Sequence, residues 1–143
     1  MTQGPPIRAE YFASGFFIQK LMHGKMEKVS SEHMCFVDVR DVAYAHLQAI
    51  KVPEAANKRF ILCKDSPSFH DYARPIVEKY GPLGWPVCNV MGDPIPNEYV
   101  SLFDNKASRE ILGVQYRDMK TTMIEMADRM VALGSVKNPP PTE

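Results

Sequence analysis

The 143-residue sequence has no excess of charge of either sign, because 17 lysines and arginines balance 17 aspartates and glutamates. A formal net charge of zero gives the molecule as a whole no attraction to nucleic acid or to an anionic membrane. No apolar run approaches the roughly 20 residues that cross a bilayer, and no basic region followed by a hydrophobic stretch begins the chain. We therefore expect a soluble, non-secreted protein of the cytoplasm that binds neither nucleic acid nor membrane.

Cysteine is scarce, and Cys35, Cys63 and Cys88 are odd in number and lie far apart in apolar surroundings. This pattern favours buried thiols in a reducing compartment over a disulfide framework. The histidines are widely spaced, and neither CxxC nor HExxH occurs, so the sequence predicts no metal site. His33 and Cys35 could point to the same face of a strand and bind a metal ion together, but we favour a surface histidine beside a buried thiol. His46 is interpreted as a hydrogen-bonded core residue.

Glycine never clusters: all 8 glycines stand singly, and no GxGxxG, GxxGxxG, Walker loop or GxSxG motif occurs. A fingerprint of that kind lets backbone N–H groups approach phosphates, so this sequence offers no dinucleotide-binding loop. Tyr116 and Lys120 match the YxxxK spacing of reductases. Asp118 between them is predicted to cap the last helix, which leaves Tyr116 outside that helix, and we interpret the match as coincidental.

What is present is an alternation of strand-like and helix-like segments. Short apolar runs predict strands at 34–37, 59–63 and 85–90, and amphipathic patterns predict helices at 14–24, 42–50, 66–80, 104–112 and 118–133. The predicted N-caps are Ser14, either Asp38 or Asp41, Ser66, Asp104 and Asp118. The pattern indicates an α/β fold with a largely parallel sheet, with about three short strands and five helices, and such a sheet is incomplete. We expect one domain over residues 1–136 and a disordered proline-rich tail at 137–143.

Several strings of residues, in this order, carry a resemblance to a known family. They are Gly4-Pro5, GFFIQKLMHGK at 15–25, FVDVRDVAYAHLQAI at 36–50, RFILC at 59–63, and FDNKASREILGVQYRDMKTTMIEMADRMVALG at 103–134. They resemble the C-terminal half of the extended short-chain dehydrogenase/reductases, the NAD-dependent epimerase/dehydratase superfamily. Within it they are most similar to the dihydroflavonol reductase, cinnamoyl-CoA reductase and aldehyde reductase group.

The resemblance implies that this chain is the substrate-binding part of a Rossmann-type NADP-dependent carbonyl reductase. In that family the dinucleotide fingerprint and the Ser-Tyr-Lys residues lie upstream of the Gly-Pro. No catalytic or cofactor-binding residue is therefore assigned here, and the chain alone is expected to be inactive.

The substrate side would be lined by the segments Pro5–Phe17 and Met91–Phe103. Their candidate aromatic wall is Phe12, Phe16, Tyr99 and Phe103, although the same aromatics would equally suit core packing. We expect the acidic and basic residues at 38–41 to tie the strand to the following helix rather than to touch ligand.

Two alternatives stay open beside this reading. In the first alternative, the chain is a non-catalytic interaction module that docks another chain, or a second copy of itself, through an exposed sheet edge. In the second alternative, the chain is a subunit that is completed in trans by the missing Rossmann half.

Overall fold

The computed structural model describes residues 1–10, 13–96 and 100–137. Within these residues the chain forms the five expected helices and a parallel pair of very short strands, so the α/β class is confirmed. The strands are β1 (Thr2–Gln3) and β2 (Val37–Asp38). The helices are α1 (Phe16–Met22), α2 (Val39–Lys51), α3 (Phe69–Tyr80), α4 (Lys106–Glu110) and α5 (Met119–Ala132). Three single 3-10 turns, η1 (Ala13–Gly15), η2 (Pro53–Ala55) and η3 (Gly81–Leu83), complete the elements.

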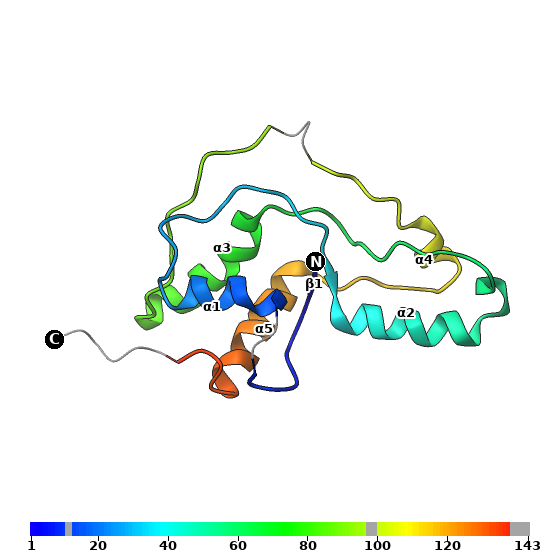
Figure 1. Cartoon of the computed structure of the whole chain (residues 1–143), viewed down its shortest axis with the longest axis horizontal. Helices are drawn as coiled ribbons and strands as arrows, with labels where there is room; N and C mark the ends of the chain where they lie inside the picture. Colours follow the sequence, from blue (N-terminus) through cyan, green and yellow to red (C-terminus); the bar gives the residue numbers. More distant parts are fainter. Residues whose placement is uncertain (11–12, 97–99, 138–143) are drawn as a thin grey trace.

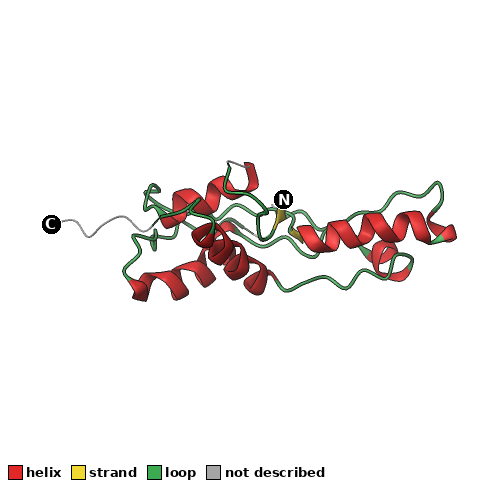
Figure 2. Ribbon diagram, turned by 90° about the horizontal axis from the view of Figure 1, so that it is seen from below, coloured by secondary structure: helices red, strands yellow, loops and turns green. Residues whose placement is uncertain are grey.

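The molecule is elongated, with the two strands near its middle (Figure 1). Helices α1, α3 and α5 gather on one side of the strands, and α2 and α4 extend from the other side, as the view from below also shows (Figure 2). None of the described helices is long and apolar enough to cross a membrane.

The sheet is smaller than the sequence indicated. β1 and β2 are parallel, with Thr2 opposite Val37 and Gln3 opposite Asp38. Of the predicted strand at 34–37 only Val37 belongs to a strand, and the described segments 59–63 and 85–90 form none. A segment forms a strand only where a neighbouring segment pairs with it through backbone hydrogen bonds. The 59–63 segment lacks such a neighbour, and Ile61 within it is exposed.

The main core lies between α1, α3 and α5. It is built on Tyr72 and Ile76 from α3 and on three methionines of α5 that recur at intervals of three and four residues. Those methionines are Met123, Met126 and Met130, and each is fully buried. The sequence interpretation of this helix as a core element, rather than as a free methionine-rich binding face, is confirmed.

Several helix ends follow the predicted capping chemistry. Asp38 caps α2 by accepting from the Arg40 backbone N–H, and Asp118 caps α5 by accepting from the Thr121 backbone N–H. Three predicted caps are wrong. Ser14 lies within η1, so that Gly15 precedes α1. Asp104 accepts from the Lys106 backbone N–H at 2.8 Å, but the N-cap of α4 is Asn105. Helix α3 begins after Ser68 rather than Ser66. Ser68 is favoured because Asp71 completes a reciprocal capping box with it.

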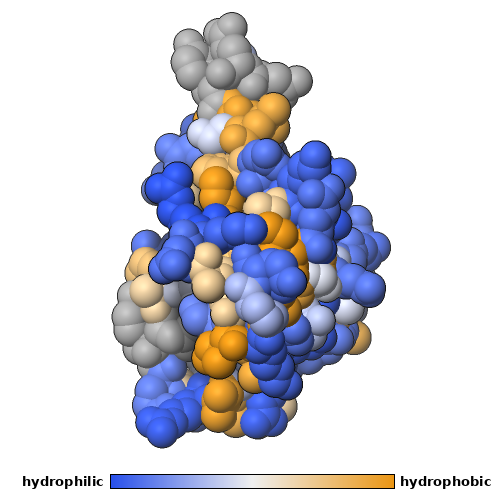
Figure 3. Space-filling model, turned by 90° about the vertical axis from the view of Figure 1, so that its right-hand side faces the viewer, coloured by the Kyte–Doolittle hydropathy of each residue, from blue (hydrophilic) through white to orange (hydrophobic). Residues whose placement is uncertain are grey.

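A second, smaller core joins α2 to the segment after α4. It contains Ala45, Ala55, Leu112 and Val114. The opposite side of α2 carries Val39, Leu47 and Ile50, which are 41%, 47% and 86% exposed. We call these three residues the α2 apolar face. Figure 3 looks at this end of the molecule and shows apolar side chains reaching the surface between polar ones.

The prediction that His46 lies in the core is wrong. Its side chain is exposed, and its Nδ1 lies 2.8 Å from the Val42 carbonyl oxygen. The helical pattern identified an apolar stripe but not what covers it. The chain packs α2 through the side that carries Asp41 and Ala45, and so the stripe around His46 is left at the surface.

Candidate functional site

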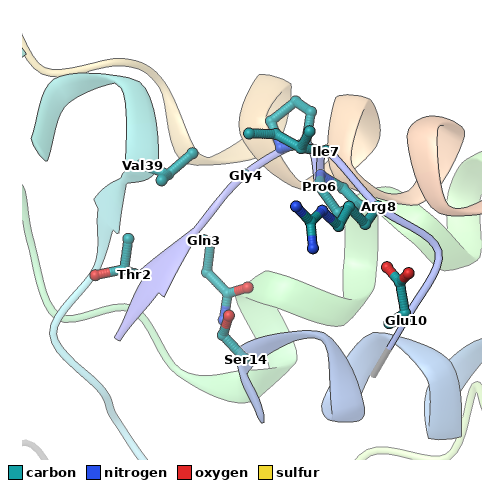
Figure 4. Close-up of a pocket in the computed structure, with 10 residues that line it drawn as sticks. Thr2, Gln3, Gly4, Pro6, Ile7, Arg8, Glu10, Ser14 and Val39 are labelled. Carbon is teal, nitrogen blue, oxygen red and sulfur yellow. The ribbon is translucent and has the colours of Figure 1, made fainter. Parts of the chain in front are cut away.

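A groove opens beside β1, between the loop that follows it, the η1 turn and the start of α2. Its volume is about 690 Å³. We call it the β1 groove. It is lined by Thr2, Gln3, Gly4, Pro5, Pro6, Ile7, Arg8, Glu10, Ser14 and Val39 (Figure 4). Most of this lining is the N-terminal loop, within the Pro5–Phe17 segment that the sequence analysis placed on the substrate side.

Gly4 sets the direction in which the loop leaves β1. Its φ is +146°, and a Cβ at this position would come within 2.6 Å of the Val39 Cγ1. Its backbone N–H also donates to the Sδ of Met126 at 3.4 Å. A residue without a side chain is therefore required where the loop crosses between α2 and α5.

Two hydrogen bonds hold the loop against the C-terminal end of α5. Arg129 donates from Nε to the Pro6 carbonyl oxygen at 3.3 Å, and the Ser135 hydroxyl donates to the Ala9 carbonyl oxygen at 3.0 Å. The loop is thus fastened at two carbonyls to a helix of the main core, which gives the β1 groove a fixed outer wall.

Gln3 is the unusual residue of the β1 groove. It is 1% exposed, yet neither its Nε2 nor its Oε1 has a hydrogen-bond partner within the described part of the chain. Figure 4 shows its side chain leaving β1 on the side of Ser14, which lines the same groove. Buried polar groups are normally paired, since an unpaired one costs about 1–3 kcal/mol. Gln3 therefore carries a buried amide whose missing hydrogen bonds cost the described part of the chain folding free energy.

The junction between β2 and α2 is a network of charged groups. The Asp38 carboxylate is fully buried and accepts from the Arg40 guanidinium at 2.6 and 2.9 Å and from the Thr122 hydroxyl at 2.7 Å. Arg40 also donates to Glu125 at 2.6 Å. Burial alone would raise the pKa of Asp38, but the hydrogen bonds from Arg40 and Thr122 outweigh it and hold that pKa below its ordinary value.

Asp41 makes a second tie from the same helix. It is buried and accepts from the Arg117 backbone N–H at 2.8 Å and from the Arg117 guanidinium. The prediction that the charged residues at 38–41 tie β2 to α2 is confirmed for Asp38 and Arg40, whereas Asp41 instead ties α2 to Arg117. Together they join the first turn of α2 to the start of α5, and thereby place Val39 against the β1 groove.

The predicted aromatic wall is only partly within the described residues. Phe12 and Tyr99 lie outside them. Phe16 begins α1 and is 43% exposed, with the Lys20 Nζ 4.5 Å from its ring centroid. Phe103 is 44% exposed in the loop before α4. Neither belongs to the lining of the β1 groove, although Phe16 stands two residues after Ser14, and their role as substrate contacts stays a prediction.

The other candidate groups have structural partners. The Tyr116 hydroxyl hydrogen-bonds the Ser108 hydroxyl at 2.7 Å, and the Lys120 Nζ lies 3.7 Å from a Glu78 carboxylate oxygen. Tyr116 lies outside α5, as predicted. Burial raises the pKa of the Cys63 thiol to about 12, so it stays protonated. Among the described residues, no cluster of three or more His, Cys, Asp or Glu side chains could hold a metal ion.

The β1 groove does not fit the phosphates of a dinucleotide. Its one glycine, Gly4, is packed against Val39 and Met126, so its backbone is closed to a phosphate group. The other described glycines with positive φ stand alone at turns and helix ends. A small ligand with an apolar body and one or two polar atoms suits the groove better.

Comparison with known proteins identifies relatives of the chain. No family model matches the chain. It is 36% identical over 98 residues to the ketoreductase azaE of Aspergillus niger, covering 67% of this chain and 28% of that protein. It is 27% identical over 142 residues to cinnamoyl-CoA reductase 1 of Petunia hybrida, covering 97% of this chain and 41% of that protein.

The chain is homologous to reductases of the NAD(P)-dependent epimerase/dehydratase superfamily. The resemblance seen in the sequence is thus confirmed. The NADPH-dependent methylglyoxal reductase GRE2 of Saccharomyces cerevisiae is 29% identical over 117 residues, covering 80% of this chain and 34% of that protein.

The fold of these reductases agrees with that of the chain. The crystal structure of yeast methylglyoxal/isovaleraldehyde reductase Gre2 with NADPH superimposes with a TM-score of 0.72 at 24% identity. The match covers 93% of this chain and 45% of the yeast protein. The chain therefore spans less than half the length of these curated and solved reductases.

The groove residues divide into those that sequence reasoning found and those it missed. The resemblance located the loop after Gly4-Pro5, but it did not single out Gln3, because nothing in a sequence shows that a glutamine at a strand end is buried without partners. Its place directly before the Gly-Pro turn was the one available signal.

Proposed function

We propose that this chain supplies the substrate-binding part of an NADPH-dependent carbonyl reductase of the dihydroflavonol, cinnamoyl-CoA and aldehyde reductase group. The observation that carries the proposal is the β1 groove, an apolar-lined opening of about 690 Å³ with a buried amide, on a fold shared with NADPH-bound reductases. The substrate is a small carbonyl compound. The homologous NADPH-dependent reductases support this choice of cofactor and substrate class.

The proposal divides the reaction between two parts of the fold. The described residues offer no phosphate-binding glycine loop, and the one YxxxK match has its tyrosine outside the helix. The groups that bind the cofactor and transfer the proton therefore belong to a Rossmann-type half. This chain positions the substrate and excludes water from it. It binds NADPH poorly and is inactive by itself.

The remaining site residues and boundaries belong to the same proposal. Phe12, Phe16, Tyr99 and Phe103 form the aromatic wall of the substrate side. Residues 1–136 act as one domain, and 137–143 form a tail, of which 138–143 lie outside the described residues. The three cysteines are free, which supports a reducing compartment such as the cytoplasm.

Two assays on the purified chain test whether it binds the substrate while cofactor binding and catalysis belong to another part of the fold. We expect no consumption of NADPH with a panel of aldehydes and ketones, and only weak binding of NADPH by fluorescence titration. We also expect carbonyl compounds to give saturation-transfer signals from the chain without cofactor. Steady turnover by the chain alone would contradict the absence of catalytic residues. A panel in which no carbonyl compound binds would contradict the assignment of the substrate site.

A specific surface favours a second candidate function, that of a subunit completed in trans. The α2 apolar face is uncovered, and β1 pairs with β2 alone among the described residues. Parallel strands normally lie in larger sheets that are covered on both faces. The occupant we propose is a Rossmann-type unit, because the solved reductases of this fold continue for more than half of their length beyond the matched part.

Light scattering after size exclusion tests this candidate. Addition of a separately purified dinucleotide-binding half of a homologous reductase should give a one-to-one complex, and L47D should abolish it. An unchanged monomer would contradict completion in trans. A self-associated chain in the absence of the added half would instead favour the interaction module.

A further inference from the structure

Cys35 and Cys63 lie on neighbouring backbone segments, although α2 separates them in the sequence. The Phe36 N–H donates to the Asp65 carbonyl oxygen at 2.9 Å, and the Lys64 N–H donates to the Phe36 carbonyl oxygen at 2.7 Å. These bonds belong to an isolated antiparallel bridge between Phe36 and Asp65. Each cysteine directly precedes one of the bonded residues, so the bridge brings the two cysteines together.

The side chain of Cys63 is directed toward the segment that carries Cys35. Its Sγ donates to the Asp65 carbonyl oxygen at 3.2 Å, which is the same oxygen that the Phe36 N–H contacts. The Cys63 thiol is also hydrogen-bonded to the Cys35 side chain. A disulfide requires two cysteines whose side chains meet from adjacent segments of backbone. Cys35 and Cys63 meet this requirement, and both are free thiols.

The three thiols of the chain differ in their surroundings. Cys63 is 2% exposed, whereas Cys35 is half-buried. Cys35 is therefore the member of the pair that a small solute reaches first. Cys88 is buried in the main core, and its Sγ lies 3.8 Å from the Val90 carbonyl oxygen. It provides an internal control for a reaction that depends on the contact between Cys35 and Cys63.

We propose that Cys35 and Cys63 form a modification site at which hydrogen peroxide produces a reversible intramolecular disulfide. The Cys35 sulfur attacks one peroxide oxygen, the O–O bond breaks, and a sulfenic acid and one water are formed. The Cys63 sulfur then attacks the Cys35 sulfur. An S–S bond forms, the S–O bond breaks, and the Cys63 proton leaves with the hydroxyl group as a second water. The two thiols together lose two electrons, which reduce the peroxide.

The disulfide joins the 59–63 segment, which forms no strand within the described residues, to the segment that leads into β2. It closes a loop that contains α2 and η2, and thereby restricts the unfolded chain. We expect the Tm of the oxidised chain to rise by roughly 10 °C. This chemistry lies outside the β1 groove and does not depend on the proposed function.

Peptide mapping of the full chain tests the proposal. Trypsin places each cysteine on its own peptide, because cleavage after lysine and arginine gives peptides 29–40, 60–64 and 80–106. The folded chain is treated with hydrogen peroxide, and the remaining thiols are alkylated before cleavage. We expect peptides 29–40 and 60–64 to be linked and Cys88 to be alkylated. Dithiothreitol should separate the linked peptides by thiol–disulfide exchange.

Three variants test the order of the two steps. C88S should form the same disulfide as the native chain. C63S should stop at the sulfenic acid of Cys35, which dimedone traps. C35S should leave Cys63 unoxidised, because the peroxide does not reach that buried thiol. Circular dichroism shows whether each variant is folded, and the mapping of the native chain requires no substitution.

Several results would overturn the proposal. One is a peroxide-treated native chain in which peptides 29–40 and 60–64 are not linked. Another is dimedone labelling of Cys63 in C35S. Oxidation in concentrated urea, where the native contact is lost, should give all three pairings of the cysteines. A folded chain that gives the same mixture as the unfolded chain would show that the contact does not direct the reaction.

Discussion

Replacing Gln3 with methionine is expected to stabilise the chain. The native amide is 1% exposed and unpaired within the described residues, so its burial costs free energy that no contact returns. Methionine has a similar unbranched shape and an adaptable thioether, and it fills the same space without a buried polar group.

The size of the effect follows from the cost of one unpaired buried amide. That cost is about 1–3 kcal/mol, and Q3M should recover most of it. In a domain of this size each kcal/mol shifts Tm by roughly 3–4 °C, so we expect Tm to rise by about 3–12 °C. Thermal unfolding followed by circular dichroism measures the shift, and urea unfolding checks that the free energy of unfolding changes in step.

The matched control is Gln115→Met, because Gln115 is exposed. Substitution there should change the free energy of unfolding by no more than about 0.5 kcal/mol. A Q3M variant that is less stable than the native chain by more than the control would refute the reasoning. It would mean that the amide is satisfied in the free chain, and that Gln3 is a structural residue.

Three further predictions concern the frame of the β1 groove. Thr122→Val removes a hydroxyl that donates to buried Asp38, and it should lower the free energy of unfolding by about 1–3 kcal/mol in urea titrations. The same substitution at the exposed neighbouring residue, Thr121→Val, should lower the free energy of unfolding by well under half as much. Gly4→Ala should cost about 2 kcal/mol or more because its Cβ meets α2, while Gly84→Ala, also at positive φ but with nothing within 4 Å, should cost about 1 kcal/mol. The pKa of Asp38 is lowered in the folded chain, so its carboxylate contributes fully to the free energy of unfolding above its unfolded pKa of about 4. That contribution is lost as the pH falls through the folded pKa. The urea midpoint should therefore fall in acid, and it should fall less in D38N. Equal losses within either matched pair, or an unchanged acid slope in D38N, would contradict these contacts.

The helices were predictable because their signals are local. Helix α5 is predicted by its methionine spacing, and the starts of α2 and α5 are predicted by the capping residues Asp38 and Asp118. Each signal lies within one or two helical turns, and the structure confirms them. The strands were less predictable. An apolar run such as 59–63 becomes a strand only beside a partner, and sequence pattern does not show whether that partner is present.

The same limit explains the site. The family resemblance led to the loop after Gly4-Pro5, where the β1 groove lies. It gave no reason to choose Gln3, because burial without a hydrogen-bond partner depends on what β1 packs against. The helical pattern, for its part, placed His46 inward, because it marks the apolar stripe of α2 but not the element that covers it.

The most direct test of the account is to find where a simple carbonyl compound contacts the chain. Intermolecular nuclear Overhauser effects between butanone and the ¹⁵N,¹³C-labelled protein would locate it. The account predicts contacts from the butanone methyl groups to Ile7, Ser14 and Val39 in the β1 groove. Contacts confined to Leu47 and Ile50 on the α2 apolar face, with none in the β1 groove, would contradict it.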